Sequence, residues 1–128
     1  MESTLIKTKL AEKFGQLYNC SIPLEIPSND IPDNNCIRFY YDGAVSECKG
    51  LQRKYKFRLR CFSDTPEKSA AKADTAVKII RNAQPETFSG GGYYCNVHHY
   101  NIDNIQIDIL KSAGNILYFS EIKFSVII

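Results

Sequence analysis

Apolar and polar side chains alternate through residues 51–63, the stretch around which we expect the rest of the chain to be organised. The apolar set is Leu51, Tyr55, Phe57, Leu59 and Cys61, and the polar set is Gln52, Lys54, Lys56, Arg58 and Arg60. Because successive side chains of a strand point to opposite faces, this period of two predicts a strand with a core face and a cationic face. At about 3.3 Å per residue, the strand would be roughly 40 Å long.

Two other segments have the spacing of helices. Apolar residues recur at intervals of three and four over residues 3–19, where Ser3 or Thr4 would cap the start and Gly15 would weaken the last turn. A second helix is expected from Thr65, a good capping residue followed by proline, to about residue 83. Its predicted inner face consists of Ala70, Ala73, Ala76 or Val77, and Ile80.

The remaining segments favour strands and turns. In the strand expected over 104–110, the alternation places Ile105, Ile107 and Ile109 inward. Residues 36–63 would form a long hairpin whose tip, 43–50, projects as an arm. The other expected elements are a short edge strand within 22–27, a strand over 36–42 with a turn at 42–43, a glycine turn at 89–92, strands over 93–100 and 116–128, and a hairpin turn at 113–115.

The order of these elements predicts an α+β fold, with two helices packed on a mostly antiparallel sheet of five to six strands. The length favours a single domain over residues 1–128. A formal charge of +2 is too small to indicate nucleic-acid binding through the net field. The sequence has no signal-peptide pattern, no membrane-spanning stretch and no Cys-x-x-Cys pair among its five cysteines, so we expect a protein kept in a reducing cytoplasm, without a membrane partner.

Candidate chemistry is sparse. His98 and His99 are the only histidines, and adjacent residues of a strand face opposite ways, so the pair does not suit one metal site. Cys95 precedes His98 by three residues and would also face away from it, which argues against a nucleophile and its base. Cys61 falls in the inferred core and should be inert. We therefore expect no catalytic residue, no metal site and no cofactor, and a protein that is not an enzyme.

A row of four cations is the candidate contact with a partner: Lys54, Lys56, Arg58 and Arg60. Charges on the outer face of an antiparallel sheet are commonly just solvated, so a plain solvent-exposed face is one interpretation. The other is contact with phosphates or with an acidic partner surface. Only Phe62 adds an aromatic ring to this face, which favours generic backbone contact over sequence-specific recognition.

Several features follow one another in a recognisable order. An amphipathic N-terminal helix leads into Ile22-Pro-Leu24, and a long strand ends in Cys61-Phe-Ser-Asp-Thr-Pro66. An alanine-rich helix follows at once, with Ala70-Ala-Lys-Ala-Asp74, and after a glycine turn the chain ends on a strand of alternating aromatics, Tyr118 to Val126. Over nearly the whole chain, this layout resembles the tail terminator and tail-completion proteins of long-tailed bacteriophages, including the minor capsid proteins of Gram-positive phages.

The resemblance implies a structural role without catalysis. Such proteins assemble as hexameric rings on the last ring of the tail tube, contact the tail tube protein and the head–tail connector protein, and let DNA pass through a central hole. It places the protein in the virion, at the tail end of the head–tail junction, after synthesis in the bacterial host cytoplasm. The row from Lys54 to Arg60 would then contact a partner, or line the lumen and touch the passing DNA non-specifically.

Two alternatives belong to other classes. One is a small nucleic-acid-binding α+β module that uses the basic strand face over residues 54–60. The other is a small cytoplasmic enzyme that uses Cys95 or His99 in a pocket. The first alternative predicts DNA binding that falls steeply with salt, whereas ring formation should depend little on salt.

Overall fold

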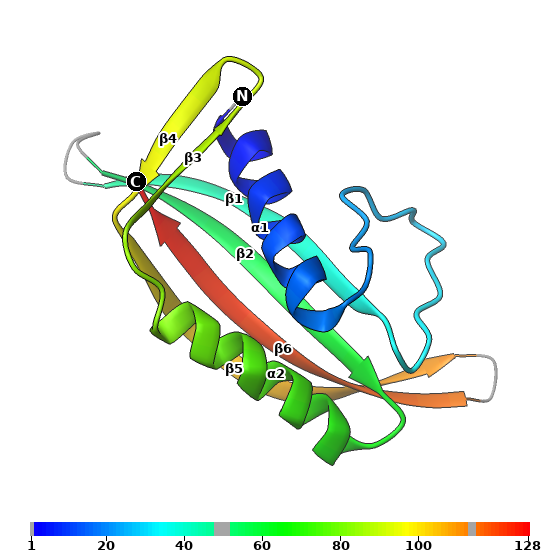
Figure 1. The fold of residues 1–128 in the computed structure, drawn as a ribbon. Helices are drawn as coiled ribbons and strands as arrows, with labels where there is room; N and C mark the ends of the chain where they lie inside the picture. Colours follow the sequence, from blue (N-terminus) through cyan, green and yellow to red (C-terminus); the bar gives the residue numbers. More distant parts are fainter. Residues whose placement is uncertain (1, 48–51, 113–114) are drawn as a thin grey trace.

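The computed structural model describes residues 2–47, 52–112 and 115–128. Within these residues the chain forms an α+β fold with mostly antiparallel sheets, which confirms the predicted fold class (Figure 1). The elements are α1 (Glu2–Tyr18), β1 (Ile37–Glu47), β2 (Gln52–Ser63), α2 (Pro66–Arg81), β3 (Glu86–Gly90), β4 (Tyr93–Val97), β5 (His99–Ser112) and β6 (Asn115–Ile127). Among the described residues, neither helix is both long and apolar enough to cross a membrane.

The strands divide between two sheets. The larger sheet has the antiparallel order β1-β2-β6-β5, so β2 lies inside it and β1 and β5 are its outer strands. The smaller sheet is a hairpin of β3 and β4. The strand predicted over 93–100 is therefore interrupted at His98, where the chain passes from one sheet to the other. Strand β3 was not predicted, because only Phe88 is buried in its five residues and no alternation shows.

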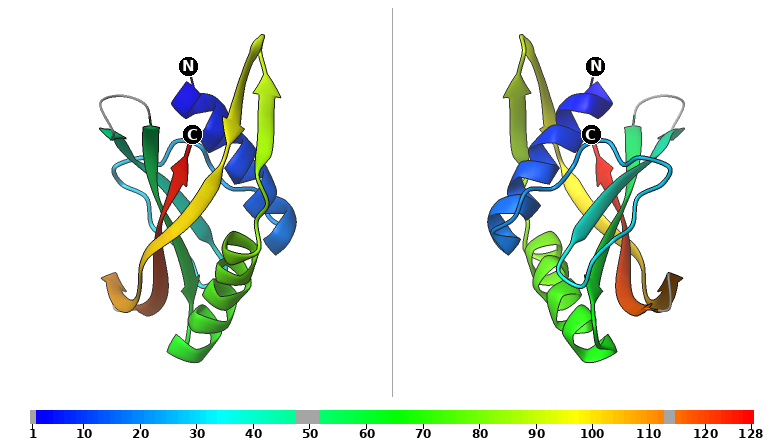
Figure 2. Two further views of the ribbon diagram at one scale, coloured as in Figure 1. Left: turned by 90° about the vertical axis from the view of Figure 1, so that its left-hand side faces the viewer. Right: turned by 90° about the vertical axis from the view of Figure 1, so that its right-hand side faces the viewer.

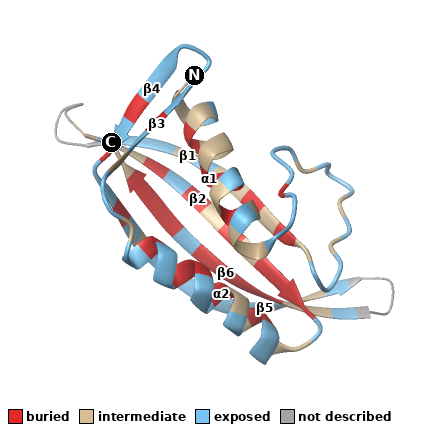
Figure 3. Cartoon of the chain, viewed as in Figure 1, coloured by how far each residue is buried: buried red, intermediate tan, exposed pale blue. Residues whose placement is uncertain are grey.

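Both helices pack on the same face of the larger sheet (Figures 1 and 2). The ring of Phe14 in α1 meets Phe39 and Phe124 edge-on, at centroid distances of 5.7 and 5.9 Å. Phe57 of β2 stacks on Phe39 at 5.1 Å. Buried residues lie in both helices and along the strands behind them (Figure 3). The apolar face of β2 is thus the floor of the core, as its alternation predicted, with Tyr55, Phe57, Leu59 and Cys61 all buried.

Helix α1 ends in a tight backbone turn rather than by fraying. The N–H of Cys20 donates to the carbonyl of Gly15 at 3.0 Å, and the N–H of Asn19 donates to Gln16 at 3.3 Å. Asn19 has a left-handed φ of 53°, so this is a Schellman motif with asparagine at C′. A Cβ on Gly15 would lie 2.9 Å from the Cys20 carbonyl oxygen, so glycine is what lets the chain fold back so closely. The predicted caps were wrong, since the helix already begins at Glu2.

Helix α2 begins as predicted. Thr65 accepts a hydrogen bond from the N–H of Lys68 at 3.2 Å, and Pro66 occupies the first helical position. Ala73, Ala76, Val77 and Ile80 are buried, but Ser69 takes the place expected for Ala70. The Ser69 hydroxyl is satisfied inside the core, because it lies 3.0 Å from the Ser120 hydroxyl of β6.

Two predicted turns and one predicted strand differ in the structure. Strand β1 continues through Asp42 and Gly43, where a β-bulge with Gly43 at φ 107° replaces the expected turn. Residues 43–47 of the predicted arm are paired with β2 as part of β1, and the rest of the arm, 48–50, lies outside the described residues. Residues 22–27 form no strand. The glycine turn is confirmed between β3 and β4, with Gly91 and Gly92 at positive φ, whereas the turn predicted at 113–115 falls largely outside the described residues.

Candidate partner-binding face

The larger sheet presents one face away from the two helices, which we call the open face. On β2 it carries the four predicted contact residues, Lys54, Lys56, Arg58 and Arg60, none of which is buried. The register places Tyr40 beside Arg58 on β1, and Lys123 and Glu121 beside Arg58 and Arg60 on β6. The open face is therefore built from all four strands, because Gln106 and Asn104 of β5 lie beside Glu121 and Lys123, and the cation row is one of its two inner columns.

One half of this face, the arginine end, consists of Arg58 and Arg60 with their partners. Arg58 Nε donates to both carboxylate oxygens of Asp42, at 2.7 and 3.0 Å, and Arg60 Nε donates to Glu121 at 2.6 Å. The Glu121 side chain is only 3% exposed and also lies 3.7 Å from Arg58. These arginines are neutralised within the molecule, which reduces their capacity to attract an external anion.

Aromatic rings support the arginine end. The guanidinium of Arg58 lies 4.6 Å from the centre of the Tyr40 ring, and that of Arg60 lies 4.7 Å from the centre of the Phe119 ring. Phe119 in turn packs on Phe62 at 5.2 Å. Guanidinium groups interact favourably with the faces of such rings, so the rings help to hold the arginines in place.

The segment between α1 and β1 borders the same end. Asp30 of this segment forms an ion pair with Arg38 at 2.9 Å on the outer strand β1. A hollow of about 590 Å³ lies there and is lined by residues of the segment and of the sheet, among them Leu24, Pro27, Tyr40, Arg58 and Arg60. The arginine end is therefore partly enclosed by its own chain.

The other half, the lysine end, consists of Lys54, Lys56 and Lys123. These three side chains line a cavity of about 310 Å³ together with Asp42 and Asp103. Within the described side chains, Lys54 and Lys56 have no ion-pair partner, and Lys123 reaches Glu121 only at 4.0 Å. Lysine is a flexible point charge, so these ammonium groups remain available to an anion.

The sequence predicted only part of this face. Its alternation placed the four cations together but did not identify their neighbours, which are Tyr40, Phe119, Glu121 and Lys123. The alternation in residues 116–128 does put Lys123 and Glu121 on the outer side of their strand, so a signal existed. What the sequence lacked was the pairing of β2 with β6, which brings residues about 60 positions apart into one row.

A second surface, on β5, is exposed although its residues were predicted to be buried. Ile105, Ile107 and Ile109 of β5 were expected in the core but are 43%, 54% and 49% exposed. They do lie on the helix side, because Ile107 pairs with Ser120, whose hydroxyl contacts Ser69 of α2. Since β5 is an outer strand and α2 covers only part of it, the three isoleucines form an apolar ladder at the margin of the sheet.

The two candidate cysteines lie in the core, whereas His99 pairs with Ile127 in the same row as Lys54, at the lysine end of the open face. Cys61 is fully buried, and burial raises the pKa of its thiol to about 11. Cys95 is also buried, and burial raises its pKa, which disfavours the reactive thiolate. His98 and His99 are exposed. Among the described residues, no three side chains of His, Cys, Asp or Glu are grouped as a metal site would require.

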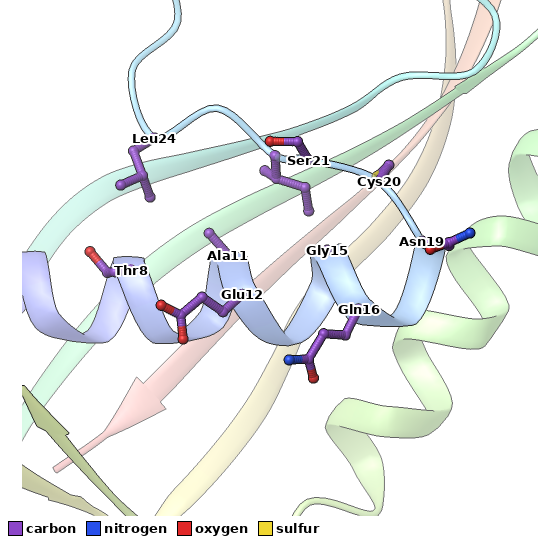
Figure 4. Close-up of a pocket in the computed structure, with 10 residues that line it drawn as sticks. Thr8, Ala11, Glu12, Gly15, Gln16, Asn19, Cys20, Ser21 and Leu24 are labelled. Atoms are coloured by element: carbon purple, nitrogen blue, oxygen red, sulfur yellow. The ribbon is translucent and has the colours of Figure 1, made fainter.

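A further hollow lies between α1 and the segment that follows it (Figure 4). Its volume is about 710 Å³, and Thr8, Ala11, Gly15, Gln16 and Leu24 are among the residues that line it. The one carboxylate in its lining, Glu12, is 59% exposed and pairs with Lys9 at 3.8 Å. Burial raises the pKa of the Cys20 thiol in this hollow, which disfavours its reactive thiolate. Its lining is mainly small and uncharged, without a convergent charged group.

Comparison with known proteins does not assign a function to this face. No protein-family model matches the sequence, and a search of curated proteins finds no significant match either.

Proposed function

We propose that this chain is a structural subunit of a bacteriophage tail, similar to a tail terminator, which caps the tail tube and joins it to the head connector. The observation that supports this best is the apolar ladder of Ile105, Ile107 and Ile109 on the outer strand β5. Exposed apolar surface on a strand at the margin of a sheet is typical of a contact between subunits. The assignment to a phage tail rests on the resemblance of the sequence layout.

The sheet geometry supports a closed assembly. Strands β1 and β5 lie at opposite margins of the larger sheet, so one subunit offers two different outer strands. Contacts between two different surfaces lead from subunit to subunit in one direction, and they close into a ring when the rotation permits. The ring size of six comes from the resemblance alone, as do the tail tube protein, the connector protein and the position at the head–tail junction.

The test is the native mass, measured by light scattering over a range of protein and salt concentrations, with negative-stain images of any large species. We expect rings whose formation depends little on salt. Ile107→Lys should prevent assembly, because a charge in the ladder would be buried at the contact. Ile31→Lys is the matched control, since Ile31 is 74% exposed but lies outside the sheet.

Recombinant subunits of this kind can remain monomeric until a tail tube is present, so the assay includes purified tubes. Capture of the wild-type protein by tubes, with loss of capture in Ile107→Lys, would support the proposal. A protein that stays monomeric under all conditions and does not bind to the tubes would contradict the proposal.

The nucleic-acid-binding alternative is now less favoured for the whole row over residues 54–60. Arg58 and Arg60 contribute two of its four charges, and both are paired with carboxylates of the same chain. What remains in its favour is the lysine end.

A further inference from the structure

The three lysines of the lysine end lie close together across two strands. Lys56 pairs with Ser125 of β6, Lys123 pairs with Arg58 in the next row, and Lys54 lies two residues along the strand from Lys56. Side chains of diagonal neighbours in a sheet are within reach of one another when they are long. Three ammonium groups and two carboxylates line one cavity, so its lining carries a net positive charge that favours an anion.

The two carboxylates in the same cavity are already engaged elsewhere. Asp42 receives two hydrogen bonds from Arg58 Nε. Asp103 accepts from the hydroxyl of the buried Ser125, and from Asn101 Nδ2 at 3.0 Å. Asp42 is therefore neutralised by a guanidinium, whereas the donors to Asp103 are neutral groups and Asp103 keeps its negative charge in the cavity.

The shape of the site favours an extended ligand over a small molecule. The cavity is open to solvent, and Lys56 and Lys123 are themselves exposed. Among the described residues, the Tyr and Phe rings of the open face, Tyr40, Phe62 and Phe119, all belong to the arginine end, whereas the His99 ring lies two strands away from Lys54, beyond Ile127. A ligand at the three lysines would therefore meet charge without a Tyr or Phe ring beside them, which suits the backbone of a duplex.

We propose that Lys54, Lys56 and Lys123 form a binding site for phosphate groups of a nucleic-acid backbone, without sequence preference. The site is complete on one subunit and does not rest on ring formation. If rings do form, the proposal predicts that this end of the open face is turned toward the DNA. The arginine end then has a structural role, because its ion pairs hold neighbouring strands together.

The experiment measures binding of a fluorescently labelled DNA duplex by anisotropy over a series of salt concentrations. The site variant is Lys54→Gln/Lys56→Gln/Lys123→Gln. The matched control is Lys9→Gln/Lys68→Gln/Lys78→Gln, which removes the same charge from the helices on the other side of the sheet. A third variant replaces the site lysines with arginine and keeps their charge.

We expect the wild type to bind weakly and with steep salt dependence. The site variant should lose at least about tenfold in affinity, and the slope of log K against log salt should fall by roughly one unit per lysine removed. The control and arginine variants should keep most of the wild-type slope. Melting curves for each variant establish that it is folded, and single substitutions at Lys56 and Lys123 replace the triple if it is not.

Three outcomes would overturn the proposal. The first is no binding of the duplex by the wild type even at low salt. The second is an equal loss in the control variant, because net charge would then explain the effect. The third is competition by inorganic phosphate or by poly-glutamate as strong as that by unlabelled DNA, which would assign the site to free phosphate or to an acidic protein surface.

Discussion

The carboxylate of Glu121 lies 2.6 Å from Nε of Arg60, and its side chain is only 3% exposed. A buried carboxylate costs free energy unless it is paired and hydrogen-bonded. Here one carboxylate on β6 serves Arg60 and Arg58 of β2, with Lys123 at 4.0 Å. The pair therefore joins two neighbouring strands on the open face, where no helix covers them.

Glu121→Gln tests this relationship. The amide keeps the shape of the side chain but removes the charge that the two arginines share, and its NH2 group would oppose their donors. Because the arginines are partly exposed, we expect a loss of about 1–3 kcal/mol in the free energy of unfolding. Urea denaturation should show a lower midpoint with an unchanged m-value.

The control for this substitution is Glu12→Gln. Glu12 pairs with Lys9 at 3.8 Å on the exposed side of α1, and such surface pairs contribute about 0–1 kcal/mol. Equal effects of the two substitutions would show that burial of Glu121 does not matter.

Gly15→Ala should destabilise the protein, against the usual preference of helices for alanine. In an ordinary helix interior this change stabilises by about 0.5–1 kcal/mol. At Gly15 the new Cβ would lie 2.9 Å from the backbone oxygen of Cys20, so the turn after α1 has to open. We expect a net loss of about 1–2 kcal/mol in urea unfolding. A gain in stability would mean that the Schellman turn can open at little cost in free energy.

Asn19→Gly probes the same turn from its other side. Asn19 holds a left-handed φ of 53°, a conformation that costs a residue with a Cβ more than glycine. We therefore expect a gain of a few tenths of a kcal/mol, up to about 1. Thermal unfolding of the Gly15→Ala and Asn19→Gly variants side by side should give shifts of opposite sign.

Parts of this structure were predictable from sequence because the signal is local. The face of β2 follows from alternation within one segment, and the start of α2 follows from Thr65 and Pro66. The bulge at Asp42 was not predictable in this way. Asp-Gly suits both a turn and a bulge with glycine at positive φ, and only the register with β2 distinguishes them.

Whether a helix covers a strand cannot be predicted from the sequence of that strand either. Alternation correctly placed Ile107 on the helix side of its strand, yet it could not reveal that α2 fails to cover that margin. The same limit applies to the candidate site, where Lys54 and Lys56 were identified and Lys123 was not. Their relationship depends on which strands pair, which no single segment encodes.

Ser69 and Ser120 offer a test of a buried polar contact. Both are buried, their hydroxyl oxygens are 3.0 Å apart, and Ser69 also donates to the carbonyl of Pro66 at 2.9 Å. Ser69→Ala leaves the Ser120 hydroxyl without that partner and should cost about 1–2 kcal/mol. Adding Ser120→Ala removes the orphaned group, so the double variant should be no less stable than Ser69→Ala. Additive losses in the double-mutant cycle would contradict direct coupling.

The buried thiol of Cys61 predicts a pH dependence of stability. Burial raises its pKa from 9.0 to about 11, so the folded protein holds this proton more tightly than the unfolded chain. The resulting stability is present below pH 9 and is lost as the pH rises toward 11. Burial also raises the pKa values of Tyr18 and Tyr100, so the decline continues at higher pH.

Cys61→Ala isolates the contribution of this thiol. It lowers stability at neutral pH through the lost packing, but it should flatten the decline between pH 9 and 11 by up to roughly 2–3 kcal/mol. Urea unfolding at several pH values measures both curves. Cys20→Ser is the comparison at an exposed thiol, whose pKa is also raised by burial and which should change the decline less than Cys61→Ala. Parallel curves for the wild type and Cys61→Ala would show that this proton is not linked to folding, since only a group with different pKa values in the two states changes the slope.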